Sequence, residues 1–442
     1  MLISSLPANV DLDKKLDTTD SLSRIKILTR CLAPIAVFFL IFRTGTSIKV
    51  FDLLAAIIGV FLAVDGEARL LFRNVWQHFR PYVYYFLALV ALIAVAQALM
   101  YAGPGTSVIS AETAVNFARV IFNSYVFFLA AFLICYDKKL LMLVCAAIFI
   151  SPAVVLPAYW DLSPDAYISG GRLTGFLQTP ILFGFWMAIV FIVGIGLMLA
   201  ARTQWLKIIT AAWLIIIANF IMWAGSRASW IALALALILC FIFYIQRRKW
   251  FKIKQLVVIC IVAGLGGYLL IPNDGLKMKP FIADRAANLA ISVVTLSPSA
   301  IQAQSHSYGW PVFLKSIFKT PQGVGFGYPI SSKIGTNNSF LEVALYGGIG
   351  ASIIFFAILA NLFGAVIRAI RNLCDSSMFD VKVAWLLVSV IVAVDIFFTN
   401  AFLWRHAWFA FGMVFGISLA EQRGVDDLSL LAKKSEDKSR SL

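Results

Sequence analysis

The segment Pro272-Asn-Asp-Gly-Leu-Lys-Met-Lys-Pro280 begins the one long hydrophilic stretch that lies between apolar segments of this chain. The stretch runs to about Gly335 and contains the glycine-rich sequence Pro321-Gln-Gly-Val-Gly-Phe-Gly-Tyr-Pro329. Before and after it, long apolar runs are joined by short connections. We therefore expect a bundle of hydrophobic helices with one large polar loop, and we expect chemistry at that loop.

The composition of the chain indicates its class. Hydrophobic residues make up 61% of the sequence and charged residues 13%, a balance that soluble globular domains do not show. A bilayer core about 30 Å thick needs roughly 20 apolar residues per helix, and lipid admits only helices or closed barrels. The apolar runs here are continuous and do not alternate with polar residues. The sequence therefore predicts an all-α, polytopic integral membrane protein.

About twelve transmembrane segments are expected from the lengths of the apolar runs. Their approximate bounds are 31–48, 50–64, 83–101, 114–135, 140–157, 181–200, 208–224, 229–245, 256–271, 337–366, 383–400 and 405–420. We expect a single domain, without internal repeats. Its parts are an N-terminal tail at 1–30, spans one to nine in 31–271, the large loop at 272–336, spans ten to twelve in 337–420, and a C-terminal tail at 421–442.

The basic residues predict how these spans are oriented. With the N-terminus in the cytoplasm, about 25 of the 37 Lys and Arg residues fall on the cytoplasmic side, as the positive-inside rule requires. Basic loops of this kind explain the net charge of +15 without a nucleic-acid partner. Both termini are then cytoplasmic. The large loop faces outward, into the periplasm if this is the inner membrane of a bacterium.

Ionisable residues inside or beside the spans gather at their predicted outer ends. An ionisable group within a spanning helix costs several kcal/mol by insertion scales, so each one is a functional candidate. Several arginines near one surface favour an anionic ligand, because the guanidinium fork suits phosphate oxygens. Alternatively, the arginines pair with the acidic members or extend to lipid headgroups as structural ties. The set comprises Arg119, Arg172, Arg227, Glu342, Asp395, Arg405 and His406.

The large loop contains a second candidate element. Residues 311–319 can form a short helix, because proline is tolerated in a first helical turn. Ile317 and Phe318 are among the residues that would then face the membrane, with Lys315 and Lys319 on another side. A helix lying on the outer leaflet explains both lysines through contact with membrane lipid headgroups. The alternative is that Lys315 contributes to the anion site.

Metal chemistry has little support in the sequence. No His-x-x-x-His or Glu-x-x-His pattern occurs, and the six cysteines show no paired spacing. The sequence Gly323-Val-Gly-Phe-Gly327 lacks the Gly-Lys-Ser/Thr of a phosphate-binding loop, so we expect only a close backbone approach there. His306 and His406 lie on the outer side, where either could transfer a proton or serve a structural role.

Four motifs, in a fixed order, resemble the O-antigen ligase and O-antigen polymerase superfamily of bacterial membrane glycosyltransferases. They cover about residues 165–355, and the expected topology agrees with that superfamily. The motifs are Arg172-Leu-Thr-Gly175 with Pro180, Gly225-Ser-Arg227-Ala-Ser-Trp230, Trp310 followed by Pro321-Gln-Gly-Val-Gly-Phe-Gly327, and Asn338-Ser-Phe-Leu341 with Gly347-Gly-Ile-Gly350.

The resemblance implies a metal-independent and cofactor-free transfer of a glycan from an undecaprenyl-diphosphate carrier to a sugar hydroxyl. A ligase of this superfamily uses lipid A-core as acceptor, and a polymerase uses a second lipid-linked glycan; both activities fit. By motif position, Arg172 and Arg227 would hold the diphosphate, with Arg119, Arg405 and Lys315 as further candidates. Fixed cations in a site with little water would stabilise the leaving diphosphate.

Two departures from the superfamily pattern concern the catalytic base. Asn337-Asn338 stands where His-Asn is usual, and His306 stands where an arginine is usual, four residues before the loop tryptophan. His306 could be the base or contact the diphosphate, or Glu342 or Asp395 could accept the proton, or no strong base is needed. Our candidates for contact with the acceptor hydroxyl are His306, Asn338 and Glu342.

Two other functional classes compete with a transferase. A transporter or flippase of an anionic lipid-linked saccharide could use the same arginines. Transporters often contain internal repeats and broken spans at corresponding positions of two halves, and the sequence indicates neither. A structural assembly factor would leave the outer arginines without a role.

Overall fold

The structure is a computed structural model that describes residues 11–41, 50–102, 111–160, 168–169, 172–177, 179–271, 280, 282–287, 310–326, 338–373, 378–399 and 401–440. Two residues of the sequence hypothesis, His306 and Asn337, lie outside these described residues. The roles expected for them stay predictions.

Nearly all of the described chain is helical. The helices are α1 (Asp11–Phe38), α2 (Val50–Val64), α3 (Gly66–Tyr101), α4 (Ala111–Tyr136), α5 (Lys138–Ile150), α7 (Pro180–Ala200), α8 (Gln204–Ala224), α9 (Arg227–Gln246), α10 (Trp250–Leu269), α13 (Trp310–Lys319), α14 (Ser339–Asn372), α15 (Phe379–Phe398) and α16 (Arg405–Arg440). Short 3-10 helices lie at η1 (Phe39–Ile41), η2 (Ser151–Trp160), η3 (Gly175–Leu177) and η5 (Ala401–Leu403). Strands β1 (Ile168–Ser169) and β2 (Arg172–Leu173) pair antiparallel, with Ser169 opposite Arg172.

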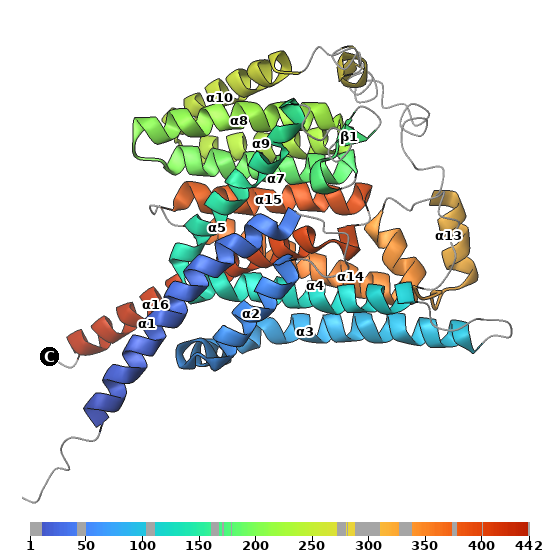
Figure 1. The fold of residues 1–442 in the computed structure, drawn as a ribbon. Helices are drawn as coiled ribbons and strands as arrows, with labels where there is room; N and C mark the ends of the chain where they lie inside the picture. The colour runs from blue at the N-terminus through green and yellow to red at the C-terminus, as the bar shows by residue number, and fades with distance from the viewer. Residues whose placement is uncertain are drawn as a thin grey trace, which may run out of the picture.

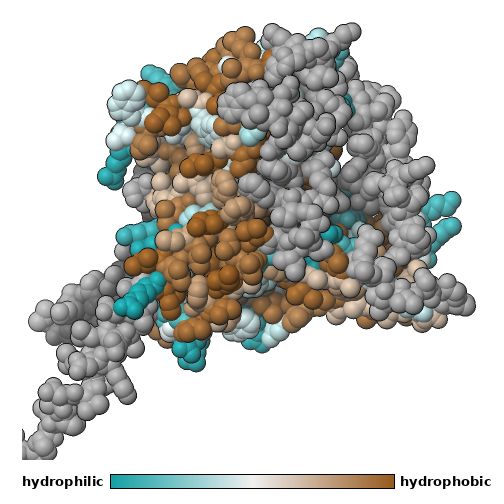
Figure 2. Space-filling view, viewed as in Figure 1, coloured by the Kyte–Doolittle hydropathy of each residue, from teal (hydrophilic) through white to brown (hydrophobic). Residues whose placement is uncertain are grey.

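The helices have the length and polarity of membrane spans. Nine of those in the described part are long and apolar enough to cross a bilayer, and α2 is a shorter apolar helix. The segment expected at 405–420 lies on α16, whereas of the segment expected at 31–48 only residues 31–38 lie on α1 and 39–41 on η1, and the rest lies outside the described residues. Hydrophobic side chains, brown in Figure 2, cover much of the coloured face of the molecule. The protein is an all-α, multi-pass membrane protein, as predicted.

The terminal helices project from one end of the bundle, and the large loop lies at the other. Helix α1 begins at Asp11 and α16 continues to Arg440, so the tails expected at 1–30 and 421–442 are helical over much of their length. Both helices project from the left side of the bundle in Figure 1, and we call this side the tail end. The opposite side, where α13 lies and α14 begins, is called the loop end.

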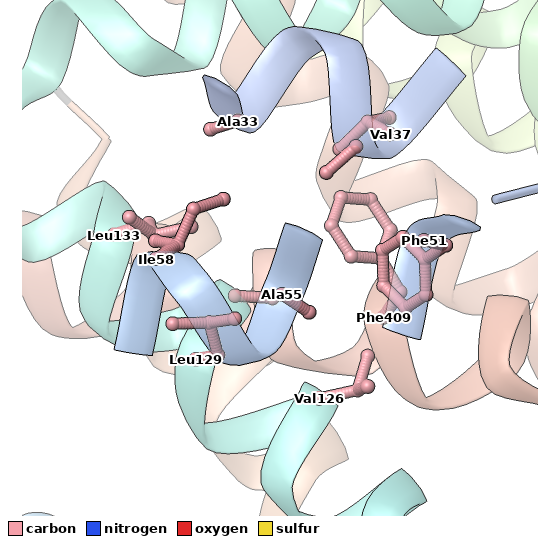
Figure 3. A pocket seen from close by; sticks show the side chains of 11 residues that line it. Ala33, Val37, Phe51, Ala55, Ile58, Val126, Leu129, Leu133 and Phe409 are labelled. Atoms are coloured by element: carbon pink, nitrogen blue, oxygen red, sulfur yellow. The ribbon is translucent and has the colours of Figure 1, made fainter. Parts of the chain in front are cut away.

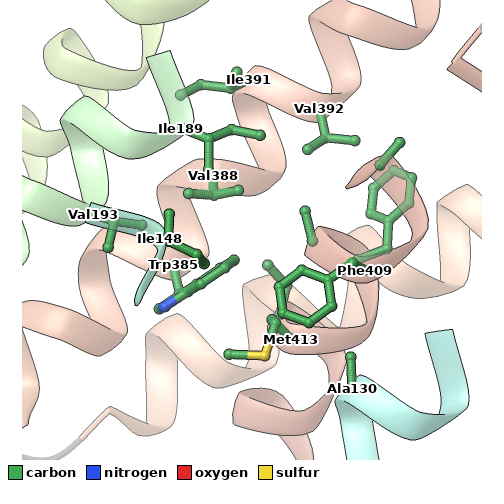
Figure 4. Close-up of a cluster of buried hydrophobic side chains, with 14 of the residues drawn as sticks. Ala130, Ile148, Ile189, Val193, Trp385, Val388, Ile391, Val392, Phe409 and Met413 are labelled. Atoms are coloured by element: carbon green, nitrogen blue, oxygen red, sulfur yellow. The ribbon is translucent and has the colours of Figure 1, made fainter. Parts of the chain in front are cut away.

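Helix α7 forms the centre of the stack. In its most apolar 18-residue window, 89% of the residues are buried, whereas the value for the peripheral helix α10 is 22%. Figure 4 shows the contact beside α7, where Ile189 lies near Val388 and Trp385 of α15, with Phe409 of α16 on the far side. A helix that is hydrophobic all round is expected in such a position.

Charged side chains at the tail end form ion pairs that connect helices far apart in the sequence. Such pairs tie helix ends together where they leave the apolar layer, and they account for several basic residues on this side. The pairs include Arg30–Asp137 at 2.5 Å, Lys252–Asp380 at 3.0 Å and Lys382–Glu421 at 2.5 Å.

Helix α14 is broken at Gly348, where φ is 77° and ψ is −175°. A single continuous span at 337–366 is expected from the sequence, and the break in α14 corrects this expectation. A left-handed φ of this kind favours glycine, because a Cβ atom would clash with the backbone. Two helical segments therefore meet at Gly348, within one membrane-spanning element.

The turn formed by residues 320–326 fills the break. The N–H of Val324 donates to the carbonyl of Leu345 at 2.8 Å, and the N–H of Gly325 donates to the carbonyl of Tyr346 at 2.9 Å. On the other side of the break, the N–H of Ile349 donates to the carbonyl of Pro321 at 3.0 Å. Irregular backbone is tolerated within a membrane only where protein satisfies its polar groups in this way. The glycine-rich sequence thus serves the close backbone approach that was expected of it.

We predict that Gly348→Ala destabilises the protein by at least about 2 kcal/mol, because left-handed backbone is costly for alanine. The added Cβ would also lie 2.3 Å from the carbonyl oxygen of Pro321. Thermal unfolding of the purified protein in detergent measures the change. Gly264→Ala in α10 is the matched control, since nothing lies within 4 Å of its Cβ position. Equal midpoints for the two variants would contradict the account of the break.

Candidate functional site

Two arginines converge on the C-terminal end of α8 at the loop end. Arg172 donates from Nε to the carbonyl of Ala224 at 2.8 Å and from Nη2 to the carbonyl of Gly225 at 3.1 Å. Arg285 donates from Nη1 to the same Gly225 carbonyl at 2.7 Å. The last carbonyls of a helix carry partial negative charge, which suits cations. Gly225 has φ 59° and ends α8 in the left-handed conformation that glycine adopts readily.

Arg227 joins this group from the first position of α9. The preceding Ser226 caps α9, and its Oγ accepts a hydrogen bond from the N–H of Ser229. Burial, followed by the charges of Arg285 and Arg227, lowers the pKa of Arg172 to about 10, so Arg172 is still charged at neutral pH. Burial and the charge of Arg227 likewise lower the pKa of Arg285. We call Arg172, Arg227 and Arg285 the arginine cluster.

The arginine cluster is electrostatically unlike the tail end. Arg227 disfavours the charged forms of Arg172 and Arg285, and Arg285 disfavours that of Arg172, whereas the tail-end cations lie against carboxylates. An anion bound between the guanidinium groups would offset this repulsion, and each contact would be a charge-assisted hydrogen bond. Carbonyl groups hold Arg172 and Arg285 in place, so little side-chain reorganisation is needed when an anion binds.

Two further predicted residues, Arg119 and Arg405, form a separate group. Arg405 pairs with Asp52 at 2.7 Å, and its guanidinium lies 5.6 Å from the ring centre of Phe122. Arg119 donates to Asn116 Oδ1 at 3.0 Å and is an electrostatic neighbour of Arg405. We call Arg119, Arg405 and Asp52 the Asp52 cluster. Arg405 thus has a carboxylate partner on α2, which the sequence does not predict.

The two clusters lie on opposite sides of α15. Helix α9, which begins with Arg227, packs against α15, and α15 packs against both α14 and α16. Helix α16 in turn packs against α4, which carries Arg119. Figure 1 shows the same order, with α8 and α9 above α15 and with α14 and α4 below it. Arg119 and Arg405 were predicted to bind the same diphosphate as the arginine cluster. The structure places these two residues in a separate group.

The first turn of α14 carries Asn338 and Glu342. Asn338 caps the helix, since its Oδ1 accepts from the N–H of Leu341 at 3.0 Å, and its Nδ2 donates to the carbonyl of Phe397 at 3.2 Å. Glu342 is 4% exposed, and its Oε1 accepts from the hydroxyl of Tyr346 at 3.0 Å. Its Oε2 is buried and has no hydrogen-bond partner among the described residues. Glu342 is therefore a buried carboxylate with one oxygen available to a proton donor.

Asp395 and His406 form a buried couple between α15 and α16. Asp395 Oδ2 lies 3.6 Å from His406 Nε2, and Asp395 Oδ1 accepts from the hydroxyl of Thr399 at 2.7 Å. The distance to the imidazole is too long for a direct hydrogen bond. The ring of Trp186 packs 6.0 Å from the His406 ring, centre to centre. The couple links the two helices next to the Asp52 cluster, since Arg405 is adjacent in sequence.

Lys315 lies on α13 and is exposed. Of the two residues expected to face the membrane, Phe318 is 75% exposed, and whether it contacts lipid stays a prediction. Ile317 is 5% exposed, on a helix that packs against α14. Helix α13 is therefore held by the protein along one side and presents Lys315 and Phe318 on its exposed surface.

Sequence reasoning missed two members of these groups. Arg285 lies in the large loop without a motif around it, and only the fold brings it to Gly225. Asp52 was read as part of a short apolar span. Within the described part of the chain, no group of three or more His, Cys, Asp or Glu residues could hold a metal ion. No protein-family model matches this chain, and no similar curated protein was found.

We predict that Glu342→Gln leaves thermal stability unchanged or raises it, because the amide keeps the side-chain shape and removes an ionisable group from a buried position. The same change at Glu421 should lower stability, since Glu421 pairs with Lys382. Thermal unfolding of both purified variants tests this contrast. A loss at Glu342→Gln that matches or exceeds the loss at Glu421→Gln would show that the carboxylate is a structural tie.

Proposed function

We propose that this protein is a metal-independent membrane glycosyltransferase of the O-antigen ligase or polysaccharide polymerase type. It transfers a glycan from undecaprenyl diphosphate to a sugar hydroxyl, in the synthesis of lipopolysaccharide, capsule or exopolysaccharide. The observation that carries the proposal is the arginine cluster, which joins Arg172 and Arg227 of two separate motifs with Arg285. In the proposed orientation, the loop end faces the periplasm of a bacterium and both termini are in the cytoplasm.

The arginine cluster would bind the diphosphate of the donor. When the bond between the sugar anomeric carbon and the diphosphate oxygen breaks, the electron pair and negative charge go to the diphosphate. Fixed guanidinium groups in a site with little water stabilise that developing charge. Arg172 is suited to this role because two carbonyl groups already orient its guanidinium.

Glu342 would accept the proton of the acceptor hydroxyl, whose oxygen forms the new glycosidic bond. Its buried Oε2 is available for this step, and Tyr346 orients the carboxylate through Oε1. Asn338 uses both ends of its amide to hold the start of α14, which supports a positioning role for it. His306 is retained as the alternative proton acceptor proposed from the sequence.

We predict that Arg172→Ala, Arg227→Ala and Arg285→Ala each reduce glycan transfer about 100-fold, the loss typical of one missing transition-state donor. Purified variants are assayed with a lipid-linked oligosaccharide donor at matched protein amounts. Arg202→Ala is the control, because Arg202 is exposed and lies between α7 and α8 at the tail end. Normal transfer by all three variants would rule out the arginine cluster as the donor site.

Surface glycans of a deletion strain distinguish the acceptor classes. Lipopolysaccharide with single repeats and no ladder indicates a polymerase. Bare lipid A-core with accumulated carrier-linked polymer indicates a ligase. Loss of secreted polysaccharide alone indicates an exopolysaccharide polymerase.

A transporter or flippase of an anionic lipid-linked saccharide is the second candidate. The break of α14 at Gly348 favours it, because broken helices often line transport sites. The turn of residues 320–326 fills this break, however, and satisfies its backbone groups. Movement of a lipid-linked saccharide across vesicle membranes without a new glycosidic bond would support transport over transfer.

A further inference from the structure

A group of cations without acidic partners lies at the tail end of α8 and α10. Between Asp165 and Asp274 the sequence contains no acidic residue. In contrast to the paired cations described above, the side chains of Lys207, Arg248 and Lys254 form no hydrogen bond or ion pair with any described residue. Arg248 and Lys254 are exposed, and Lys207 is half-buried. We call Lys207, Arg248 and Lys254 the basic surface.

Helix packing brings the members of the basic surface to one level of the bundle. Helices α8 and α10 both begin at the tail end and pack against each other. Their register is set by a close approach, since a Cβ on Gly267 would lie 2.8 Å from the backbone nitrogen of Asn219. Both helices rise about 1.5 Å per residue, so Lys254 lies level with Leu206, beside Lys207.

Arg248 stands at a position where glycine is favoured. Its φ is 54°, in the left-handed region. Its N–H donates to the carbonyl of Ile245 at 2.9 Å, and the N–H of Lys249 donates to the carbonyl of Tyr244 at 3.0 Å. This pair of hydrogen bonds ends a helix at a left-handed residue, which is usually glycine. The chain thus presents an exposed cation at the end of α9 despite a strained backbone.

Exposed aromatic side chains lie next to the basic surface in the sequence. Trp205 is 75% exposed, Trp250 60% and Phe251 69%. Tryptophan in particular gathers at the level of lipid headgroups. Toward the loop end the same helices expose Ile209 at 62% and Val258 at 59%, which suit acyl chains. In Figure 2 the upper part of the molecule is largely brown, with teal side chains at its left edge, the tail end.

The interior of the bundle has little room for a lipid. The apolar space between α1, α2, α4 and α16, beside Phe51 and Phe409 in Figure 3, has a volume of about 20 Å³. That is room for about one water molecule. A lipid chain would therefore lie on the outer faces of helices such as α8 and α10, and not in this space.

We propose that the basic surface binds an anionic phospholipid in the leaflet that meets the tail end. The three cations match the charge of the phosphate headgroup, and the acyl chains lie along α8 and α10. The positive-inside rule explains why cations lie at this end, but it does not require them to lack partners. Only the membrane class of the protein enters this inference, so it does not depend on the proposed function.

Selective lipid binding tests the inference. The full-length protein in detergent is mixed with dioleoyl phosphatidylglycerol or dioleoyl phosphatidylcholine, which share their chains and differ in net charge. Native mass spectrometry measures the bound lipid. Wild type should bind phosphatidylglycerol at least about tenfold more tightly, as expected for several cations near one anionic headgroup. The triple variant Lys207→Gln/Arg248→Gln/Lys254→Gln should lose this preference.

A matched variant removes the same charge elsewhere at the tail end. Arg69→Gln/Arg73→Gln/Arg371→Gln changes exposed residues of α3 and α14. Glu67 lies two residues before Arg69, so an acidic group accompanies these cations. This variant should keep the preference for phosphatidylglycerol. Equal loss in the two triple variants would show a general effect of charge and overturn the inference.

Further variants exclude other sites and occupants. Arg172→Ala/Arg227→Ala should keep the preference; loss in this variant alone would place the lipid at the arginine cluster and overturn the inference. Displacement by excess glycerol 3-phosphate would show that the headgroup binds without its chains, and would also overturn it. A dimer that the first triple variant lacks would assign the surface to a second copy of the chain. If that variant is unstable, Lys254→Glu alone should lower the preference.

Discussion

Inside an apolar layer no water can satisfy a backbone N–H or carbonyl that has lost its helical partner, and this constraint organises the loop end of the protein. Breaking α14 at Gly348 frees such groups on both sides of the break. The turn of residues 320–326 accepts and donates the missing hydrogen bonds. Tyr346, whose carbonyl is one of these groups, also holds the carboxylate of Glu342 through its hydroxyl. The position of a buried acid therefore depends on a turn in the loop that precedes α14.

Charge is handled differently at the two ends of the bundle. At the tail end, lysines and arginines lie against carboxylates, and those pairs fasten helices to one another. At the loop end, Arg172 and Arg285 lie instead against the carbonyls that end α8. Carbonyl groups orient a guanidinium without neutralising it, so positive charge persists there. The contrast concerns the arginine cluster alone, since Arg405 pairs with Asp52.

The sequence predicted the membrane class and the spans because the apolar runs are long and continuous. It also placed Arg172 and Arg227 in one site, since both stand in motifs at span ends. It could not predict Arg285, because no local pattern relates a loop arginine to the end of α8. The break at Gly348 was equally hidden, since paired glycines also occur in unbroken spans and the break depends on the docked turn. Arg405 was grouped with the other arginines until the fold showed Asp52 beside it.

The turn in the α14 break is held by main-chain atoms, through the carbonyl of Pro321 and the N–H groups of Val324 and Gly325. Main-chain hydrogen bonds do not depend on side-chain identity, so most positions in and before the turn can change in evolution without loosening it. The exceptions are Gly323 and Gly325, where an added Cβ would lie 2.4 Å from neighbouring atoms. Such an arrangement lets the sequence of the large loop vary while its attachment to the membrane helices stays constant.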